Sequence, residues 1–147
     1  MGRVQLDLPE KFVFSIDIPL RTGDINYGGH LGHDSILSLT QEARASMLAG
    51  YGFIEADIDG PGLIISDAVL VYKSEAFYGD TLTIDVAVGE WNKYGCDIFY
   101  LLTSKASGKE VARAKTGVVF FDYGTHKVAP APEKFRQIVE EEESKLP

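Results

Sequence analysis

A change in hydrophobic period near residue 50 constrains the fold of this chain more than any other feature of its sequence. Between about Asp34 and Ala49, apolar residues recur every three or four positions, which is the period of one face of an α-helix. From residue 62 onward, apolar and polar residues alternate, which is the period of a half-buried β-strand. The sequence therefore predicts one long helix followed by several strands.

Five segments have the strand period. One precedes the helix and four follow it, separated by short turns that contain glycine: residues 11–20, 62–77, 80–91, 96–105 and 110–122. This order predicts an α+β fold, in which the strands form an antiparallel sheet that curls around the helix. Leu37, Ala45 and Leu48 lie off the main apolar stripe of the helix, so we expect the helix to be buried on most sides.

Length and charge limit the possible functions. The 147 residues predict a single domain, 1–147, with its core at about residues 11–127 and a C-terminal tail that is helical or frayed. The net charge of −8 argues against a nucleic-acid partner, because phosphate binding needs a basic field. No apolar run is long enough for a membrane span or a signal peptide, so we expect no membrane partner and a cytoplasmic location. The single cysteine, Cys96, is interpreted as a small core residue.

The segment GDINYGGHLGHDS, residues 23–35, lies directly before the helix and is unusually rich in glycine and ionisable residues. We expect Gly28, Gly29 and Gly32 to permit sharp turns and close backbone approach. Asp34 or Ser35 is the predicted N-cap of the helix, and Gly50 its predicted C-cap. A loop that only bends would not need the aspartate, asparagine and histidines that this segment also contains.

Three segments resemble one known family: GDINYGGHLGHDSILSLTQEAR (23–44), YKSEAFYGDTLTIDVAV (72–88) and ARAKTGVVFFDYGTHK (112–127). Over about residues 12–127, the chain is similar to the hotdog-fold thioesterase superfamily, and specifically to its 4-hydroxybenzoyl-CoA thioesterase branch. The resemblance implies an antiparallel sheet wrapped around one long central α-helix. It also implies hydrolysis of an acyl-CoA or acyl-carrier thioester without a cofactor, by a homodimer or homotetramer whose active site lies at the interface.

The resemblance also implies separate roles for the helix N-terminus and for a carboxylate in the site. The positive end of a helix can stabilise the oxyanion that forms when a thioester is attacked, and the backbone at Gly32 and His33 lies at that end. A carboxylate then serves as base or nucleophile. In the branch that the chain resembles, this carboxylate would fall at Asn26, which can do neither. Asp24 and Glu42 are the candidate replacements.

Other roles remain open at this stage. Asp24 can act as the base or accept hydrogen bonds from loop amides. Glu42 lies three residues past Leu39 and is expected on the inner side of the helix, as a base or as an ion-pair partner of Lys73 or Lys115. His30 can anchor the loop or place water or substrate. We further expect Tyr27 and Lys73 to contact the substrate, and we expect no metal site, because no further ligand lies near His30, His33 and Asp34 at a suitable spacing.

Two alternative functions remain. The segment from Asp24 to His30 also resembles the Asp-x-Asn-Pro-x-His segment of hotdog enoyl-CoA hydratases, although Tyr27 replaces the proline and the spacing is one residue longer. The other alternative is a non-catalytic acyl-CoA binding module that kept the pocket and lost the base, which the asparagine at position 26 allows.

Overall fold

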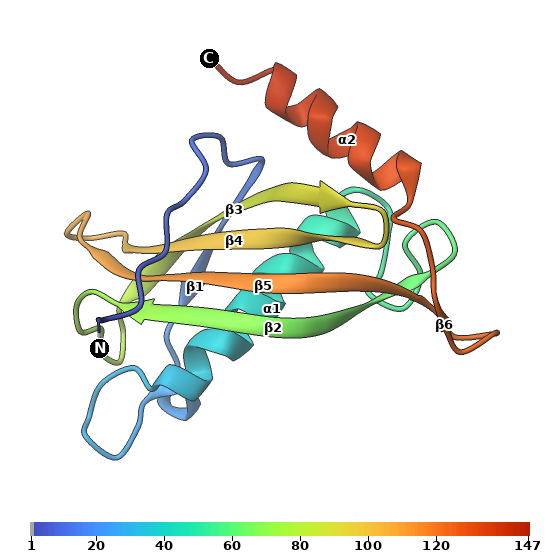
Figure 1. Ribbon diagram of the computed structural model, residues 1–147. Coiled ribbons are helices and arrows are strands. Elements are labelled where there is room, and N and C mark those ends of the chain that lie inside the picture. Colours follow the sequence, from blue (N-terminus) through green and yellow to red (C-terminus); the bar gives the residue numbers. More distant parts are fainter. Residues whose placement is uncertain (1) are drawn as a thin grey trace.

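An antiparallel sheet of six strands forms the frame of the protein, in a computed structural model that describes residues 2–147 (Figure 1). The strands are β1 (Phe14–Pro19), β2 (Gly62–Tyr72), β3 (Thr81–Asn92), β4 (Gly95–Ser104), β5 (Glu110–Asp122) and β6 (Lys127–Val128). Their order is β1-β3-β4-β5-β2, and the short β6 pairs with β5. The predicted α+β arrangement is confirmed, with β6 as an addition.

The alternating sequence of β3 shows why the strands lie as they do. Leu82, Ile84 and Val86 are fully buried on the face of the sheet that packs against the long helix. Ile84 lies opposite Ile16 of β1 on one side and opposite Leu102 of β4 on the other. The register thus places apolar residues of neighbouring strands on the same face, where they form the core.

The long helix α1 (His33–Gly50) runs diagonally across one face of the sheet (Figure 1). Its caps differ from the prediction. The N-cap is Gly32, in an extended conformation with φ −79° and without a side-chain cap, so neither Asp34 nor Ser35 caps the helix. Gly50 is the last helical residue, and Gly52 adopts the left-handed conformation (φ 88°) that reverses the chain.

The expectation that α1 is buried on most sides is wrong for this chain on its own. Leu48 is buried, but Leu37 is 40% exposed and Ala45 is also exposed. The sheet covers only one side of the helix, so the opposite side faces solvent. One helix face is therefore open in the single chain.

A second helix, α2 (Glu133–Ser144), extends the core beyond the predicted limit at about residue 127. Phe135 is fully buried and packs edge-on or tilted against four aromatic rings: Tyr51, Phe53, Trp91 and Phe120. Val139 is buried one turn later. The C-terminal segment is thus a docked helix, not a frayed one.

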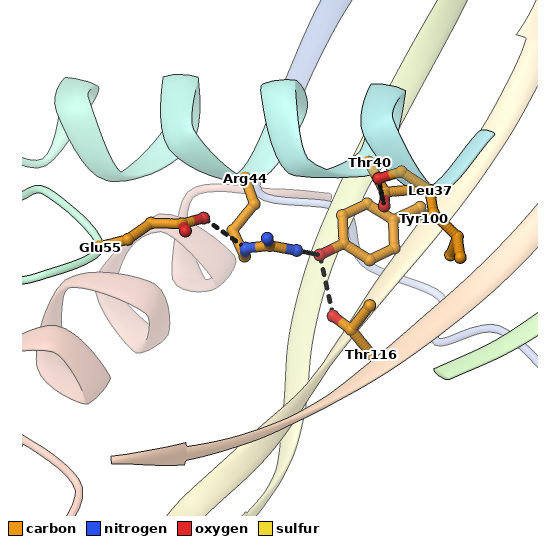
Figure 2. A network of polar contacts seen from close by, with 6 residues as sticks. All are labelled: Leu37, Thr40, Arg44, Glu55, Tyr100 and Thr116. Atoms are coloured by element: carbon orange, nitrogen blue, oxygen red, sulfur yellow. Dashed lines mark hydrogen bonds and ion pairs between the residues drawn. The ribbon is translucent and has the colours of Figure 1, made fainter. Parts of the chain in front are cut away.

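A buried polar network joins α1 to the sheet (Figure 2). The Arg44 guanidinium is 4% exposed, pairs with Glu55 at 2.6 Å and donates to the Tyr100 hydroxyl at 3.1 Å. The Tyr100 hydroxyl also shares a hydrogen bond of 2.9 Å with Thr116. Because a buried charge is costly unless it is paired, these partners hold α1 and the following loop in one position.

Candidate active site

The loop before α1 is organised around the side chain of Asn26. Its Oδ1 accepts hydrogen bonds from the backbone N–H groups of Gly28 (2.9 Å) and His30 (3.4 Å). The backbone N–H of Asn26 in turn donates to the His30 carbonyl at 2.8 Å. Since Oδ1 is held by two donors, the side-chain NH₂ group of Asn26 points away from these amides and remains a hydrogen-bond donor.

Two of the loop glycines have identifiable roles. Gly29 has a φ of 87°, which favours glycine, as predicted. Gly32 is extended, so its role is to let neighbouring side chains approach its backbone closely. A Cβ at this position would lie 2.6 Å from Asp34 Oδ1 and 3.2 Å from the Asn26 Cβ. A side chain at residue 32 would therefore require the Asp34 carboxylate to move and Asn26 to shift slightly from the first turn of α1.

The N-terminus of α1 is open to a ligand. Gly32 provides no side-chain cap, and within residues 2–147 the backbone N–H groups of His33, Asp34 and Ser35 have no hydrogen-bond acceptor. Such unpaired N–H groups carry the positive end of the helix dipole. They are suited to an oxygen atom that carries or develops negative charge.

A cleft of about 430 Å³, here called the loop cleft, lies between this loop and the end of β2. Its lining residues are Asn26, His30, Leu31, His33, Tyr72, Lys73, Ser74 and Glu75. Two hydrogen bonds fix its floor: the Leu31 N–H donates to the Ala76 carbonyl at 2.8 Å, and the Tyr72 hydroxyl donates to the Leu31 carbonyl at 3.3 Å. Burial and the nearby charge of Asp34 raise the pKa of Tyr72, so its phenol stays protonated at neutral pH.

A second cleft of about 530 Å³, here called the helix cleft, lies between β1 and α1. It is lined by Ile16, Asp17, Ile18, Pro19, Arg21, Asp24, Ser38, Leu39, Gln41 and Glu42. Asp24 is 5% exposed, and its Oδ2 accepts a hydrogen bond of 2.8 Å from the Arg21 N–H. Asp24 therefore accepts a hydrogen bond from a loop amide, which is one of the two roles that the sequence left open for it.

The structure thus divides the predicted site residues between two clefts. Asn26, His30, His33 and Lys73 line the loop cleft, whereas Asp24 and Glu42 line the helix cleft. Gly32 is at the start of α1, beside Asn26. Tyr27 is fully exposed and lines neither cleft.

The expectation that Glu42 points to the inner side of α1 is wrong. Glu42 is exposed, and it forms no hydrogen bond or ion pair with any of residues 2–147. The buried residues of α1 on either side of Glu42 are Leu39 and Thr40 before it and Ala43 and Arg44 after it, so positions 41 and 42 lie on the solvent side. Lys115 pairs instead with Asp67 at 2.5 Å and lies 3.9 Å from Asp97.

Sequence reasoning missed Glu75 as a residue of this region. The strand pattern was extended over residues 62–77, but β2 ends at Tyr72, so Lys73, Ser74 and Glu75 leave the sheet and line the loop cleft. The polar run after Tyr72 was the available signal, because consecutive polar residues break a strict alternation.

Two findings concern metals and membranes. Within residues 2–147, no three His, Cys, Asp or Glu side chains are grouped closely enough to hold a metal ion. No helix in the described part of the chain has both the length and the apolar character needed to cross a bilayer.

Comparisons with known proteins relate this geometry to one family. The sequence model of the thioesterase-like superfamily matches residues 20–139, whereas no curated protein matches the chain significantly. The fold is similar to a thioesterase-superfamily protein from Jannaschia sp. CCS1, with a TM-score of 0.81, 18% identity, and 92% of this chain and 86% of that chain covered. It is also similar to a 1,4-dihydroxy-2-naphthoyl-CoA thioesterase from Synechocystis, with a TM-score of 0.78, 20% identity and coverage of 86% and 94%. A DHNA-CoA thioesterase from Staphylococcus aureus has a TM-score of 0.74, 20% identity and coverage of 89% and 88%. These likenesses confirm the predicted hotdog fold.

Proposed function

Because the chain belongs to the thioesterase-like superfamily, we propose that it hydrolyses the thioester of an acyl-CoA to a free acid and a thiol. The observation that carries the proposal is the loop cleft, where the uncapped N-terminus of α1 and the side-chain amide of Asn26 lie against the same space. Thioester hydrolysis requires both a bound carbonyl oxygen and room for water beside it.

In this proposal the thioester carbonyl oxygen binds at the start of α1. The free N–H groups of the first helical turn and the Asn26 NH₂ group donate hydrogen bonds to it. When water attacks the carbonyl carbon, negative charge develops on this oxygen and the donors stabilise it. Asn26 therefore serves as a donor, where the branch that the sequence resembles would have a carboxylate.

Lys73 is the basic group best placed for the carrier. It lines the loop cleft and pairs with no carboxylate in residues 2–147, whereas Arg113 is engaged by Glu110 at 2.7 Å. An unpaired ammonium beside the cleft favours a carrier with phosphates, and both coenzyme A and an acyl carrier protein provide them. The two structural neighbours named as CoA thioesterases support coenzyme A as the first carrier to test.

A panel of acyl-CoA substrates, with aromatic and aliphatic acyl groups, tests the function. The purified protein is incubated with each, and free thiol and free acid are measured. We expect equal amounts of thiol and acid from at least one substrate. Addition of water to an enoyl-CoA without thiol release would favour the hydratase, and binding without turnover would favour the non-catalytic module.

We further propose that the protein is at least a homodimer. β2 is an edge strand of eleven residues, and its Ile64 and Ile65 are 39% and 37% exposed. An edge of this length with exposed isoleucines can pair with another strand, and a second copy offers the same strand. The loop cleft lies at the end of β2, so such pairing brings the site close to the interface.

A further inference from the structure

We propose that Glu75 is the general base of this hydrolysis; the inference rests on the proposed function. Glu75 is the one carboxylate among the described residues that line the loop cleft. Asn26, in the same cleft, cannot accept a proton from water. The reaction needs a group that can, and the loop cleft supplies a carboxylate from the β2 side.

The side chain of Glu75 is free to act. It is exposed and forms no hydrogen bond or ion pair with residues 2–147. Asp24, in contrast, is occupied by the Arg21 N–H, and Glu42 lies in the helix cleft. Of the three carboxylates considered, only Glu75 is both unoccupied and in the cleft that contains the oxyanion donors.

The backbone around Glu75 is fixed on both sides. The N–H groups of Lys73 and Ser74 donate to the Val111 carbonyl at 2.9 and 3.1 Å, and the Ala76 carbonyl accepts the Leu31 N–H at 2.8 Å. The Ser74 hydroxyl donates to the Glu110 carbonyl at 2.8 Å. These hydrogen bonds fix the backbone from which the Glu75 side chain extends into the cleft lining.

Glu75 and the proposed oxyanion donors come from different segments of the cleft lining. Asn26 and the first turn of α1 belong to the loop, whereas Glu75 belongs to the segment after β2. A third cleft, of about 460 Å³, adjoins at Ser74 and Glu75, which line both it and the loop cleft. Glu75 thus lines two adjoining clefts, so water can reach it from the third cleft while a thioester occupies the loop cleft.

The two histidines of the cleft are less suited to this role. His33 is the first residue of α1, beside the backbone N–H groups to which the carbonyl oxygen would bind. His30 is on the loop wall with Asn26, on the side of the carbonyl oxygen. Both are therefore placed to contact the substrate.

The proposed step conserves atoms and charge. The Glu75 carboxylate takes one proton from water while the water oxygen bonds to the carbonyl carbon and the carbonyl π electrons move to the oxygen. When the carbonyl re-forms, the C–S bond breaks and its electron pair goes to sulfur, which takes the proton back from Glu75. The products are the acid and the thiol, and Glu75 returns to its carboxylate form.

The test compares kcat and KM of Glu75→Gln, Glu42→Gln and Asp24→Asn on an acyl-CoA that the wild type hydrolyses. Glu75→Gln should lower kcat by about 10²-fold or more with KM changed only a few-fold, the scale of general-base loss, and Glu75→Asp should retain part of the rate. Glu141→Gln, an exposed glutamate of α2, is the matched control and should match the wild type. Thermal melts verify that each variant is folded.

The possible failures are distinguishable. If the wild type hydrolyses the substrate and Glu75→Gln keeps its kcat, this inference is wrong and the proposed function stands. A loss of kcat in Glu42→Gln or His30→Gln, with Glu75→Gln active, would assign the base to that residue instead. If the wild type releases thiol from no acyl-CoA or acyl-carrier thioester, the proposed function and this inference fail together.

Discussion

The proposed chemistry of the site depends on the side chain of Asn26. Its Oδ1 accepts hydrogen bonds from the backbone N–H groups of Gly28 and His30, and the carboxylate of an aspartate can accept the same two hydrogen bonds. The resemblance to a known family located this position from the sequence alone. The sequence could not show that Glu75 lies in the same cleft, because the two residues are 49 positions apart and their segments are joined by tertiary hydrogen bonds of Leu31 with Ala76 and Tyr72.

A carboxylate placed at position 26 should lower activity, because Asn26 is proposed to act as a hydrogen-bond donor. We expect Asn26→Asp to lower kcat by about tenfold or more, since the aspartate keeps the loop hydrogen bonds but replaces the NH₂ donor with a charged oxygen beside the developing oxyanion. The measurement is thiol release, with Asn26→Ala as the control that removes the donor without adding a charge. An Asn26→Asp variant as fast as the wild type would contradict the role of Asn26 as a donor.

The buried thiol of Cys96 makes the free energy of unfolding depend on pH. Burial, followed by the charge of Asp97, raises the pKa of its thiol from 9.0 to about 12. Between pH 9 and 12 the unfolded chain loses this proton while the folded chain keeps it, so the free energy of unfolding falls as pH rises. One such group contributes a slope of up to about 1.4 kcal/mol per pH unit. Urea unfolding at pH 9 to 11 should show a shallower decline in Cys96→Ala than in wild type, and equal slopes would refute this assignment.

At the scale of elements, α1 shows what periodicity can and cannot predict. The helix itself and its apolar stripe followed from spacing, since Ile36, Ala43 and Met47 are fully buried. The burial of Arg44 did not follow, because its partners Glu55 and Tyr100 come from a later loop and from β4. The end of β2 was also misplaced, because alternation alone does not say where pairing with β5 stops.

Removal of the Arg44 guanidinium should destabilise the fold. Arg44→Ala leaves Glu55 without its partner, and the loss of one member of a buried pair costs about 3–5 kcal/mol. Because the Glu55 side chain is 31% exposed and can be hydrated, we expect about 2–3 kcal/mol, or a Tm lower by roughly 5–10 °C. Calorimetry measures the change. Lys145→Ala, which breaks an exposed pair with Glu142, should hardly move Tm, and a similarly small shift in Arg44→Ala would count against the network's role.

In the whole molecule, the edge of β2 and the outer side of α1 are among the surfaces that the described chain leaves open. The sequence predicted a homodimer or homotetramer only through the family resemblance. The position of the loop cleft at the end of β2 links assembly to activity, because a partner strand on this edge would lie beside Tyr72 and Lys73.

A charge on the β2 edge should therefore disrupt assembly. We expect the wild type to be at least dimeric by light scattering at micromolar concentration. Ile65→Lys should be largely monomeric, because pairing of the two strands would desolvate the introduced ammonium group. Val4→Lys, a change at an exposed position near the N-terminus, is the control and should assemble like the wild type. A monomeric wild type would exclude the proposed interface.

A comparison of kcat between Glu75→Gln and Glu42→Gln decides whether thioester hydrolysis takes place in the loop cleft. The two variants make the same chemical change in different clefts, on the same acyl-CoA and at the same pH. We expect a kcat about 10²-fold or more below wild type for Glu75→Gln and close to wild type for Glu42→Gln. The reverse ranking would assign the reaction to the helix cleft.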